Sequence, residues 1–309
     1  MKGIELSRKF YKESVRSMLE NEFSGYIDRI AVGLVGEGSE CFGYDDEVSL
    51  DHDFEPGVCL WLTAEDDAVI GFSLMAAYDR LPKELNGFSL RRKSNGAGKK
   101  HGVFTINEFY RERIGLPAAP VSWQEWFYLP EHALSTAVNG AVFCDDLGAF
   151  SAIRNKLKKG YPYDVKLKKL SARLALMAQS GQYNFPRCLQ HREEGAAHLA
   201  LYEFINHTFY VLFLLNGCYT PFYKWRFRAL SQLSGFEDVY GCMLKLLKDV
   251  PSEQKVQLID KICKRIILEL KHQGITASDE IYLEYQALEI SKQIRNKEIR
   301  RLHLMETGE

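Results

Sequence analysis

The sequence changes character near residue 148, and this change limits what the chain can fold into. Before it, short apolar and β-branched runs alternate with Gly, Pro and acidic turns. After it, apolar residues recur at helical spacing over long stretches with few breakers, as in Leu258, Ile262, Ile266 and Leu270. We therefore predict an α+β fold, with a small mixed-sheet domain over 1–148 followed by an all-helical bundle domain over 149–309.

Local patterns predict the elements of each domain. In the first domain, we expect an amphipathic helix over 5–24, strands over 30–35, 58–62 and 103–106, and a fourth strand over 126–129. In the second domain, apolar residues three and four apart predict helices at about 163–180, 190–216, 223–233, 236–249, 254–273 and 280–302.

The charge balance and the distribution of apolar residues indicate which kinds of partner the chain is expected to bind. Lys and Arg total 40 against 41 Asp and Glu, so the chain has no overall basic field, and nucleic acid is not its expected partner. An RNA-directed enzyme is a more remote hypothesis, because the chain has one basic helical face near its end, formed by Lys292, Arg295, Lys297, Arg300 and Arg301. Seven scattered cysteines without a CxxC pair, a charged N-terminus and the short apolar run Phe209–Leu215 predict a cytoplasmic protein with no membrane partner. Nothing in the sequence indicates an oligomeric state.

One segment, 31–62, combines two features that suit phosphate chemistry. A strand runs into Gly38-Ser39, and Asp51-His52-Asp53 follows after 11 intervening residues. On a strand, Asp51 and Asp53 share one face, where two carboxylates repel each other unless a cation lies between them. Oxygen ligands at this spacing suit Mg²⁺, which also takes ligands from phosphates. Gly38 allows a close backbone approach to phosphate oxygens, and the Ser39 hydroxyl can donate to them.

This arrangement resembles the DNA-polymerase-β-like nucleotidyltransferase superfamily, in which Gly-Ser after the first strand precedes Asp-x-Asp by about a dozen residues. The string GSECFGYDDEVSLDHDF is closer still to a bacterial family described only as a domain of unknown function, and the segments TAVNGAVFCDD, GQYNFPR and LNGCYTPFYKW are similar to it as well. The resemblance implies a helical C-terminal domain like that of the aminoglycoside adenylyltransferases. It also implies transfer of an NMP, most simply AMP from ATP, to a hydroxyl group, with Mg²⁺ as cofactor and pyrophosphate as product.

The superfamily often uses a third carboxylate from a later strand, and the expected strand over 103–106 contains none. Glu108, just beyond that strand, and Asp145, near a later strand end, are the candidates. Without such a base, the chain could instead be a weak or inactive nucleotide-binding protein that regulates others. The alternative for the whole segment is an ordinary turn followed by a solvated acidic edge.

In the helical half, the segment TPFYKWRFR crowds cations and aromatic rings together. We predict that Lys224 reaches the triphosphate across a cleft between the domains, and that Tyr223 packs against the nucleotide. The alternative places the aromatic rings in the core and leaves the cations in solvent. The sequence identifies neither the acceptor nor the preferred base.

Overall fold

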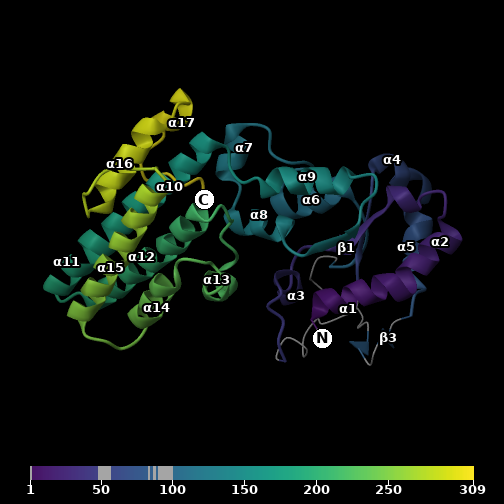
Figure 1. The fold of residues 1–309 in the computed structure, drawn as a ribbon, viewed down its shortest axis with the longest axis horizontal. Helices are drawn as coiled ribbons and strands as arrows, with labels where there is room; N and C mark the ends of the chain where they lie inside the picture. The colour runs from purple at the N-terminus through teal and green to yellow at the C-terminus, as the bar shows by residue number, and fades with distance from the viewer. Residues whose placement is uncertain (1, 48–56, 83, 86–87, 90–99) are drawn as a thin grey trace. The chain divides into compact units, whose positions relative to one another are not determined.

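The structure is a computed structural model that describes residues 2–47, 57–82, 84–85, 88–89 and 100–309. Internal contacts divide the chain into two compact units. Unit 1 comprises Met1–Pro120 and Ala133–Lys159, and unit 2 comprises Val121–His132 and Gly160–Glu309. Unit 1 contains a small mixed sheet with helices and unit 2 is helical (Figure 1), so the predicted α+β class is confirmed. The stretch Val121–His132 joins the helical unit although it precedes residue 148.

The sheet of unit 1 has four short strands in the order β5-β2-β1-β6. They are β1 (Ala31–Leu34), β2 (Cys59–Leu62), β5 (Gly102–Thr105) and β6 (Ala141–Cys144). β1 is antiparallel to both β2 and β6, whereas β2 is parallel to β5. The strands predicted over 30–35, 58–62 and 103–106 are thus confirmed. A separate antiparallel pair is formed by β3 (Glu84–Leu85) and β4 (Phe88–Ser89).

The strand predicted over 126–129 is wrong, because these residues belong to helix α7 (Trp123–Tyr128). The hydroxyl of Ser122 accepts a hydrogen bond from the Glu125 backbone N–H at 3.2 Å, and the Glu125 carboxylate accepts one from the Ser122 N–H at 2.9 Å. This reciprocal cap satisfies two N–H groups that would otherwise lack partners at the start of the helix. The fourth strand is β6, whose Ala141 pairs with Leu34.

Helices cover both faces of this sheet because its strands are apolar on both sides. On one face, Leu60 and Leu62 pack in a core with Phe10 and Leu74. On the other face, the Trp61 ring stacks on Phe150 and meets Phe109 edge-on, with ring centroids 3.8 and 5.2 Å apart. The helices of unit 1 are α1 (Gly3–Phe10), the π turn η1 (Tyr11–Val15), α2 (Arg16–Glu22), η2 (Ile27–Arg29), α3 (Ser39–Phe42), α4 (Ala64–Asp66), η4 (Asp67–Gly71), α5 (Phe72–Asp79), α6 (Ile106–Ile114), most of α8 (Glu131–Val138), and α9 (Ala149–Lys158). The helix predicted over 5–24 therefore runs through α1, η1 and α2.

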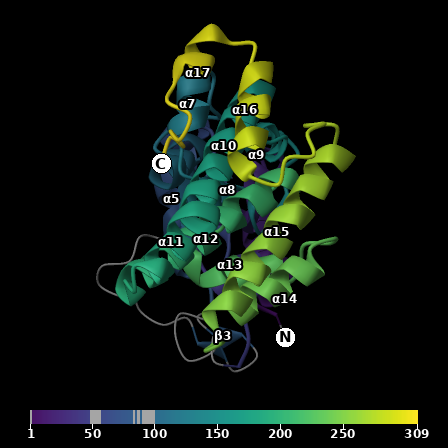
Figure 2. The ribbon, with the colours of Figure 1, turned by 90° about the vertical axis from the view of Figure 1, so that its left-hand side faces the viewer.

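Unit 2 is a bundle in which α10 packs against α12 and α16, and α14 against α15 (Figure 2). Beside α7, its helices are α10 (Tyr163–Met177), η5 (Ala178–Asn184), α11 (Phe185–Gln190), α12 (Glu194–Leu215), η6 (Tyr223–Trp225), α13 (Arg226–Leu230), α14 (Glu237–Leu246), α15 (Ser252–His272), α16 (Leu283–Gln293) and α17 (Lys297–Arg301). Among the described residues, no helix has the length and apolar character needed to cross a membrane.

Unit 2 also contains a buried charge cluster, which consists of Glu131, Lys169, Arg173 and Glu309. The Lys169 ammonium lies 3.4 Å and the Arg173 guanidinium 3.3 Å from the same carboxylate oxygen of Glu309. Glu131 is fully buried, and its carboxylate accepts a hydrogen bond from the Thr220 backbone N–H at 2.9 Å. Burial raises the pKa of Glu131 and lowers the pKa of Lys169, because it disfavours both charged forms.

Candidate functional site

The strand directions bring four distant segments to one end of the sheet. Because Gly33 pairs with Cys59 in antiparallel strands, the residues that follow β1 lie beside those that precede β2. β5 runs parallel to β2, so its start lies at this end as well, and β6 begins there opposite Leu34. We call this the turn end of the sheet; it comprises residues 36–40, Gly57, residues 100–101 and residues 139–140.

The predicted glycine turn lies at this end and is fixed by side chains. Gly36 and Gly38 have φ angles of +132° and +115°, which L side chains rarely adopt. The Asn139 side chain holds both polar groups of Gly36: its Oδ1 accepts from the backbone N–H at 2.9 Å, and its Nδ2 donates to the carbonyl at 2.7 Å. A Cβ on Gly38 would lie 2.5 Å from the Glu40 carboxylate, which would have to move, and the φ angle of +115° itself favours glycine. Ser39 is half-buried and begins α3.

A buried ion pair lies directly beneath the turn. Glu40 is 6% exposed, and its carboxylate pairs with the ammonium of Lys100, which precedes β5. The Gly140 backbone N–H donates to the Cys41 carbonyl at 2.8 Å, and the Tyr44 N–H donates to the Ser39 carbonyl at 2.8 Å. These contacts tie α3 to β6 and to the start of β5, and they support the turn from both sides.

Arg113, from the last turn of α6, places a second cation against the turn. A Cβ on Gly36 would lie 3.2 Å from both Nε and Nη2 of this arginine. The side chain is 9% exposed and its guanidinium stacks over the Phe109 ring, 3.6 Å from the ring centroid. Nη1 donates to the Phe109 carbonyl at 3.1 Å and lies 3.5 Å from the exposed carboxylate of Glu112. Burial lowers the pKa of Arg113, and the nearby charge of Glu37 opposes that shift.

His101 contributes a buried imidazole at the same end. Its ring lies against Gly57, where a Cβ would come within 2.6 Å of it. Both ring nitrogens are buried, and neither has a hydrogen-bond partner among the described residues. Burial, assisted by the positive charge of Lys100, lowers the pKa of His101 to about 3. The ring is therefore neutral at pH 7.

Asp51 and Asp53, the predicted metal ligands, lie outside the described residues. In the sequence they precede Gly57, which stands at the turn end, by six and four residues. Among the described residues, no group of three or more His, Cys, Asp or Glu side chains could hold a metal ion.

The two candidates for the third carboxylate lie at the opposite end of the sheet. Glu108 follows β5, whose last residue Thr105 pairs with Leu62, and its carboxylate accepts a hydrogen bond from the Thr105 hydroxyl at 3.0 Å. Asp145 follows β6 and caps the start of α9, where it accepts from the backbone N–H groups of Gly148 at 3.0 Å and Ser151 at 2.7 Å. Neither residue is therefore brought together with Gly38 and Ser39.

Tyr223 and Lys224 belong to unit 2, where they form η6 with Trp225. Tyr223 is 67% exposed, and the Lys224 ammonium lies 5.0 Å from the centroid of the Trp225 ring. Their contact with a triphosphate stays a prediction.

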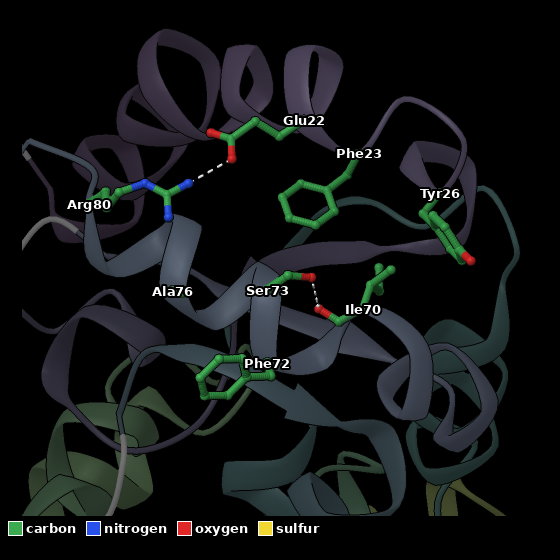
Figure 3. Close-up of a pocket in the computed structure, with 8 residues that line it drawn as sticks. All are labelled: Glu22, Phe23, Tyr26, Ile70, Phe72, Ser73, Ala76 and Arg80. Atoms are coloured by element: carbon green, nitrogen blue, oxygen red, sulfur yellow. Dashed lines mark hydrogen bonds and ion pairs between the residues drawn. The ribbon is translucent and has the colours of Figure 1, made fainter.

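A surface pocket of about 510 Å³ lies elsewhere in unit 1, between α2 and the η4–α5 helix (Figure 3). Its lining includes the rings of Phe23, Tyr26 and Phe72, and an ion pair of 2.6 Å between Arg80 and Glu22 closes one side. The pocket contains none of the predicted site residues. We therefore assign the candidate site to the turn end.

Two comparisons with known proteins found a match, one to the middle of the chain and one to most of it. Residues 126–226 match a family model. The model is described as a domain of unknown function (DUF4037). This match covers about a third of the chain, and within it lie three members of the buried charge cluster but not the glycine turn. No curated protein matches the chain. A solved structure of a nucleotidyltransferase-like protein from Exiguobacterium sibiricum 255-15 is similar at 12% identity and a TM-score of 0.38, over 91% of this chain and 81% of that one.

Sequence reasoning missed four residues at the turn end, namely Glu40, Lys100, Arg113 and Asn139. Asn139 lies in TAVNGAVFCDD, a segment already singled out, and its position directly before a glycine and a short apolar run was the available signal. Arg113 had no local signal, because it is one of several charged residues on an amphipathic helix.

Proposed function

We propose that the chain is a Mg²⁺-dependent nucleotidyltransferase that moves AMP from ATP onto a hydroxyl group of a small molecule or protein. The observation that carries the proposal is the position of the glycine turn after β1 beside the start of β2. The segment with Asp51 and Asp53 leads into that start. A backbone turn for phosphates and a carboxylate pair for metal would thus serve one reaction centre.

The donor set at Asp51 and Asp53 fits Mg²⁺, because this ion prefers carboxylate oxygens and completes its shell with water and phosphate. When bound, Mg²⁺ would offset the negative charge of the phosphates. The backbone of Gly38 and the hydroxyl of Ser39 would donate to the β- and γ-phosphates. The acceptor oxygen would attack the α-phosphorus in line, and pyrophosphate would leave from the turn.

A specific observation favours a second candidate, a nucleotide-binding regulatory protein with little turnover. Glu108 and Asp145 lie at the far end of the sheet, and the Glu40 carboxylate at the turn end is paired with Lys100. The described part of the turn end therefore offers no unpaired carboxylate besides the exposed Glu37 as general base.

The experiment measures pyrophosphate release from ATP and Mg²⁺ across a panel of hydroxyl compounds, and ATP binding by calorimetry. Asp51→Asn and Asp53→Asn should each reduce transfer by about 100-fold or more and abolish the Mg²⁺ dependence of ATP binding, with thermal stability nearly unchanged. Glu47→Gln, which removes an exposed acid from the same acidic stretch, is the matched control. Mg²⁺-dependent binding without release would favour the regulatory protein, and unfolding of the Asp variants would indicate a structural role.

The same titration tests Lys224. If its ammonium contacts the triphosphate, Lys224→Ala should weaken ATP binding by about 1–3 kcal/mol and AMP binding far less, since AMP lacks the β- and γ-phosphates. Equal losses for both nucleotides, or no loss, would leave Lys224 in the solvated role.

A further inference from the structure

Arg113 has far fewer partners than its burial requires. A guanidinium presents five N–H donors and stays charged at any physiological pH. Here the structure gives it one hydrogen bond, to the Phe109 carbonyl of its own helix. The Nε atom is buried without a partner among the described residues. The ion pair with Glu112 is weak compensation, because Glu112 is 59% exposed and water screens the pair.

The unused donors face the glycine turn. Nε and Nη2 are the two atoms closest to the position that a Cβ on Gly36 would take, at 3.2 Å each. The guanidinium lies 3.6 Å from the centroid of the Phe109 ring and 5.7 Å from that of Phe104, so we take its edge as the part that would meet a ligand. Gly36 itself cannot shift away, because Asn139 binds both its N–H and its carbonyl.

An anion with several oxygens is the ligand that this arrangement suits. The planar fork of Nε and Nη2 matches two oxygens of a phosphate, and a buried charge gains more from such a partner than an exposed one does. Glu40, the buried carboxylate of the turn, is already paired with Lys100 and does not take this role. Glu37, whose charge acts on Arg113, is exposed and lies beyond ion-pair distance.

We propose that Arg113 and the turn Gly36–Ser39 form a binding site for a phosphate chain, in which Nε and Nη2 donate to phosphate oxygens without help from a metal. The inference deepens the proposed function and rests on it for the identity of the natural ligand, a nucleoside triphosphate. The site itself requires only a polyphosphate.

The experiment uses inorganic tripolyphosphate in the presence of EDTA, so that no metal contributes. Calorimetry on the full chain should show binding that Arg113→Gln weakens at least 10-fold and that Arg113→Lys weakens less, because lysine keeps the charge but not the fork. Arg111→Gln is the matched control: it removes the same charge from an exposed position of the same helix and should change binding less than twofold. AMP binding should change far less than tripolyphosphate binding in Arg113→Gln.

Two results would overturn the inference. One is unchanged tripolyphosphate binding in Arg113→Gln, and the other is an equal loss in Arg111→Gln. If Arg113→Gln does not fold, a crystal of the wild-type protein with tripolyphosphate decides: phosphate oxygens within hydrogen-bond distance of Nε or Nη2 support the site, and phosphate elsewhere or absent rejects it.

The outcomes separate this inference from the proposed function. Nucleotidyl transfer that survives Arg113→Gln together with unchanged ATP binding rejects the inference and leaves the function standing. Loss of tripolyphosphate binding in Arg113→Gln, in a protein that transfers no nucleotide to any acceptor, supports the inference and rejects the function.

Discussion

Each of the two units contains a buried arginine, and the charges around these two side chains differ. In unit 2, Arg173 lies 3.3 Å from the Glu309 carboxylate, 3.3 Å from the His207 ring and face-on to Tyr210, with 3.6 Å to the ring centroid. In unit 1, Arg113 is buried to a similar degree, with one backbone acceptor and one exposed carboxylate. Both side chains rest on an aromatic ring, so the difference lies in the charges around them.

This difference indicates which of the two arginines has a structural role and which is available to bind a ligand. Removing a charge from water is unfavourable unless a partner of opposite sign compensates it. Unit 2 supplies that partner for Arg173 from its own chain, in the carboxylate of Glu309, so this buried charge is compensated within the fold. The described part of unit 1 supplies no buried partner for Arg113, and an incoming phosphate would complete the arrangement.

The largest expected effect concerns the buried charge cluster. Lys169→Met would leave Glu309 and the fully buried Glu131 without a cation that is 1% exposed. We expect the free energy of unfolding to fall by roughly 3–5 kcal/mol, because the fully buried Glu131 loses the cation that favours its charged form, while Glu309 keeps its contact with Arg173. Urea unfolding followed by tryptophan fluorescence measures the change.

The matched control is Lys166→Met on the same helix. Lys166 is half-buried, and burial lowers its pKa without an opposing carboxylate. Its removal should leave stability unchanged or slightly higher. A similar loss in both variants would show that α10 depends on lysine packing and not on charge pairing.

Acid should destabilise the chain through its buried histidines. Burial lowers the pKa of His101 to about 3 from the ordinary 6.5. Between these values the unfolded chain binds a proton that the folded chain does not, so stability falls as the pH drops below 6.5. The expected loss between pH 6.5 and pH 4 is roughly 3 kcal/mol for this group, at about 1.4 kcal/mol per pH unit. His101→Phe should flatten the curve of unfolding free energy against pH in this range.

His207 sharpens the comparison, because burial lowers its pKa to about 3 as well. Its ring contacts Arg173 and lies 3.4 Å from Glu203, whereas His101 has no such partner among the described residues. Both Phe variants should lose acid sensitivity, but only His207→Phe should also lose stability at pH 7. A loss at pH 7 in His101→Phe would contradict the isolation of its ring.

The smallest expected effect concerns the support of the turn. Asn139→Ala removes two hydrogen bonds to Gly36 and should lower stability by about 1–2 kcal/mol. It should also weaken tripolyphosphate binding, because the turn loses its fixed conformation. Asn216→Ala, which removes one side-chain bond to the Leu212 carbonyl in unit 2, should have a smaller effect on stability and none on binding. Equal binding by all three proteins would show that Asn139 does not position the turn.

Local sequence was sufficient for most of the elements. The β-branched run at 30–35 and the apolar run at 58–62 predicted β1 and β2, and apolar periodicity predicted most helices of unit 2, although the one helix expected over 280–302 is two, α16 and α17. The error at 126–129 was avoidable, since Ser122 and Glu125 have the spacing of a reciprocal helix cap. β6 was missed although its four residues, Ala141–Cys144, are all apolar, because so short a run does not distinguish a strand from a helix segment.

In the candidate site, too, some features follow from local sequence and others depend on strand pairing. The turn at Gly38-Ser39 was predictable from local sequence, because backbone freedom is a local property, and the carboxylate pair of Asp51 and Asp53 stays a prediction. Glu108 and Asp145 were chosen for standing near strand ends. They lie at the far end because β5 runs parallel to β2 and β6 antiparallel to β1. Strand direction depends on pairing between segments distant in sequence, and no local pattern encodes it.

The sequence by itself determined the α+β class, the helical second half and the glycine turn, since each follows from residues close together in the chain. Only the tertiary structure decided that Lys100, Arg113 and Asn139 surround that turn. These three residues come from the approach to β5, the end of α6 and the approach to β6. They meet because sheet pairing and the aromatic core around Trp61 fix where those elements end. The same packing buries the charge of Arg113, and a buried charge is favourable only with a partner of opposite sign.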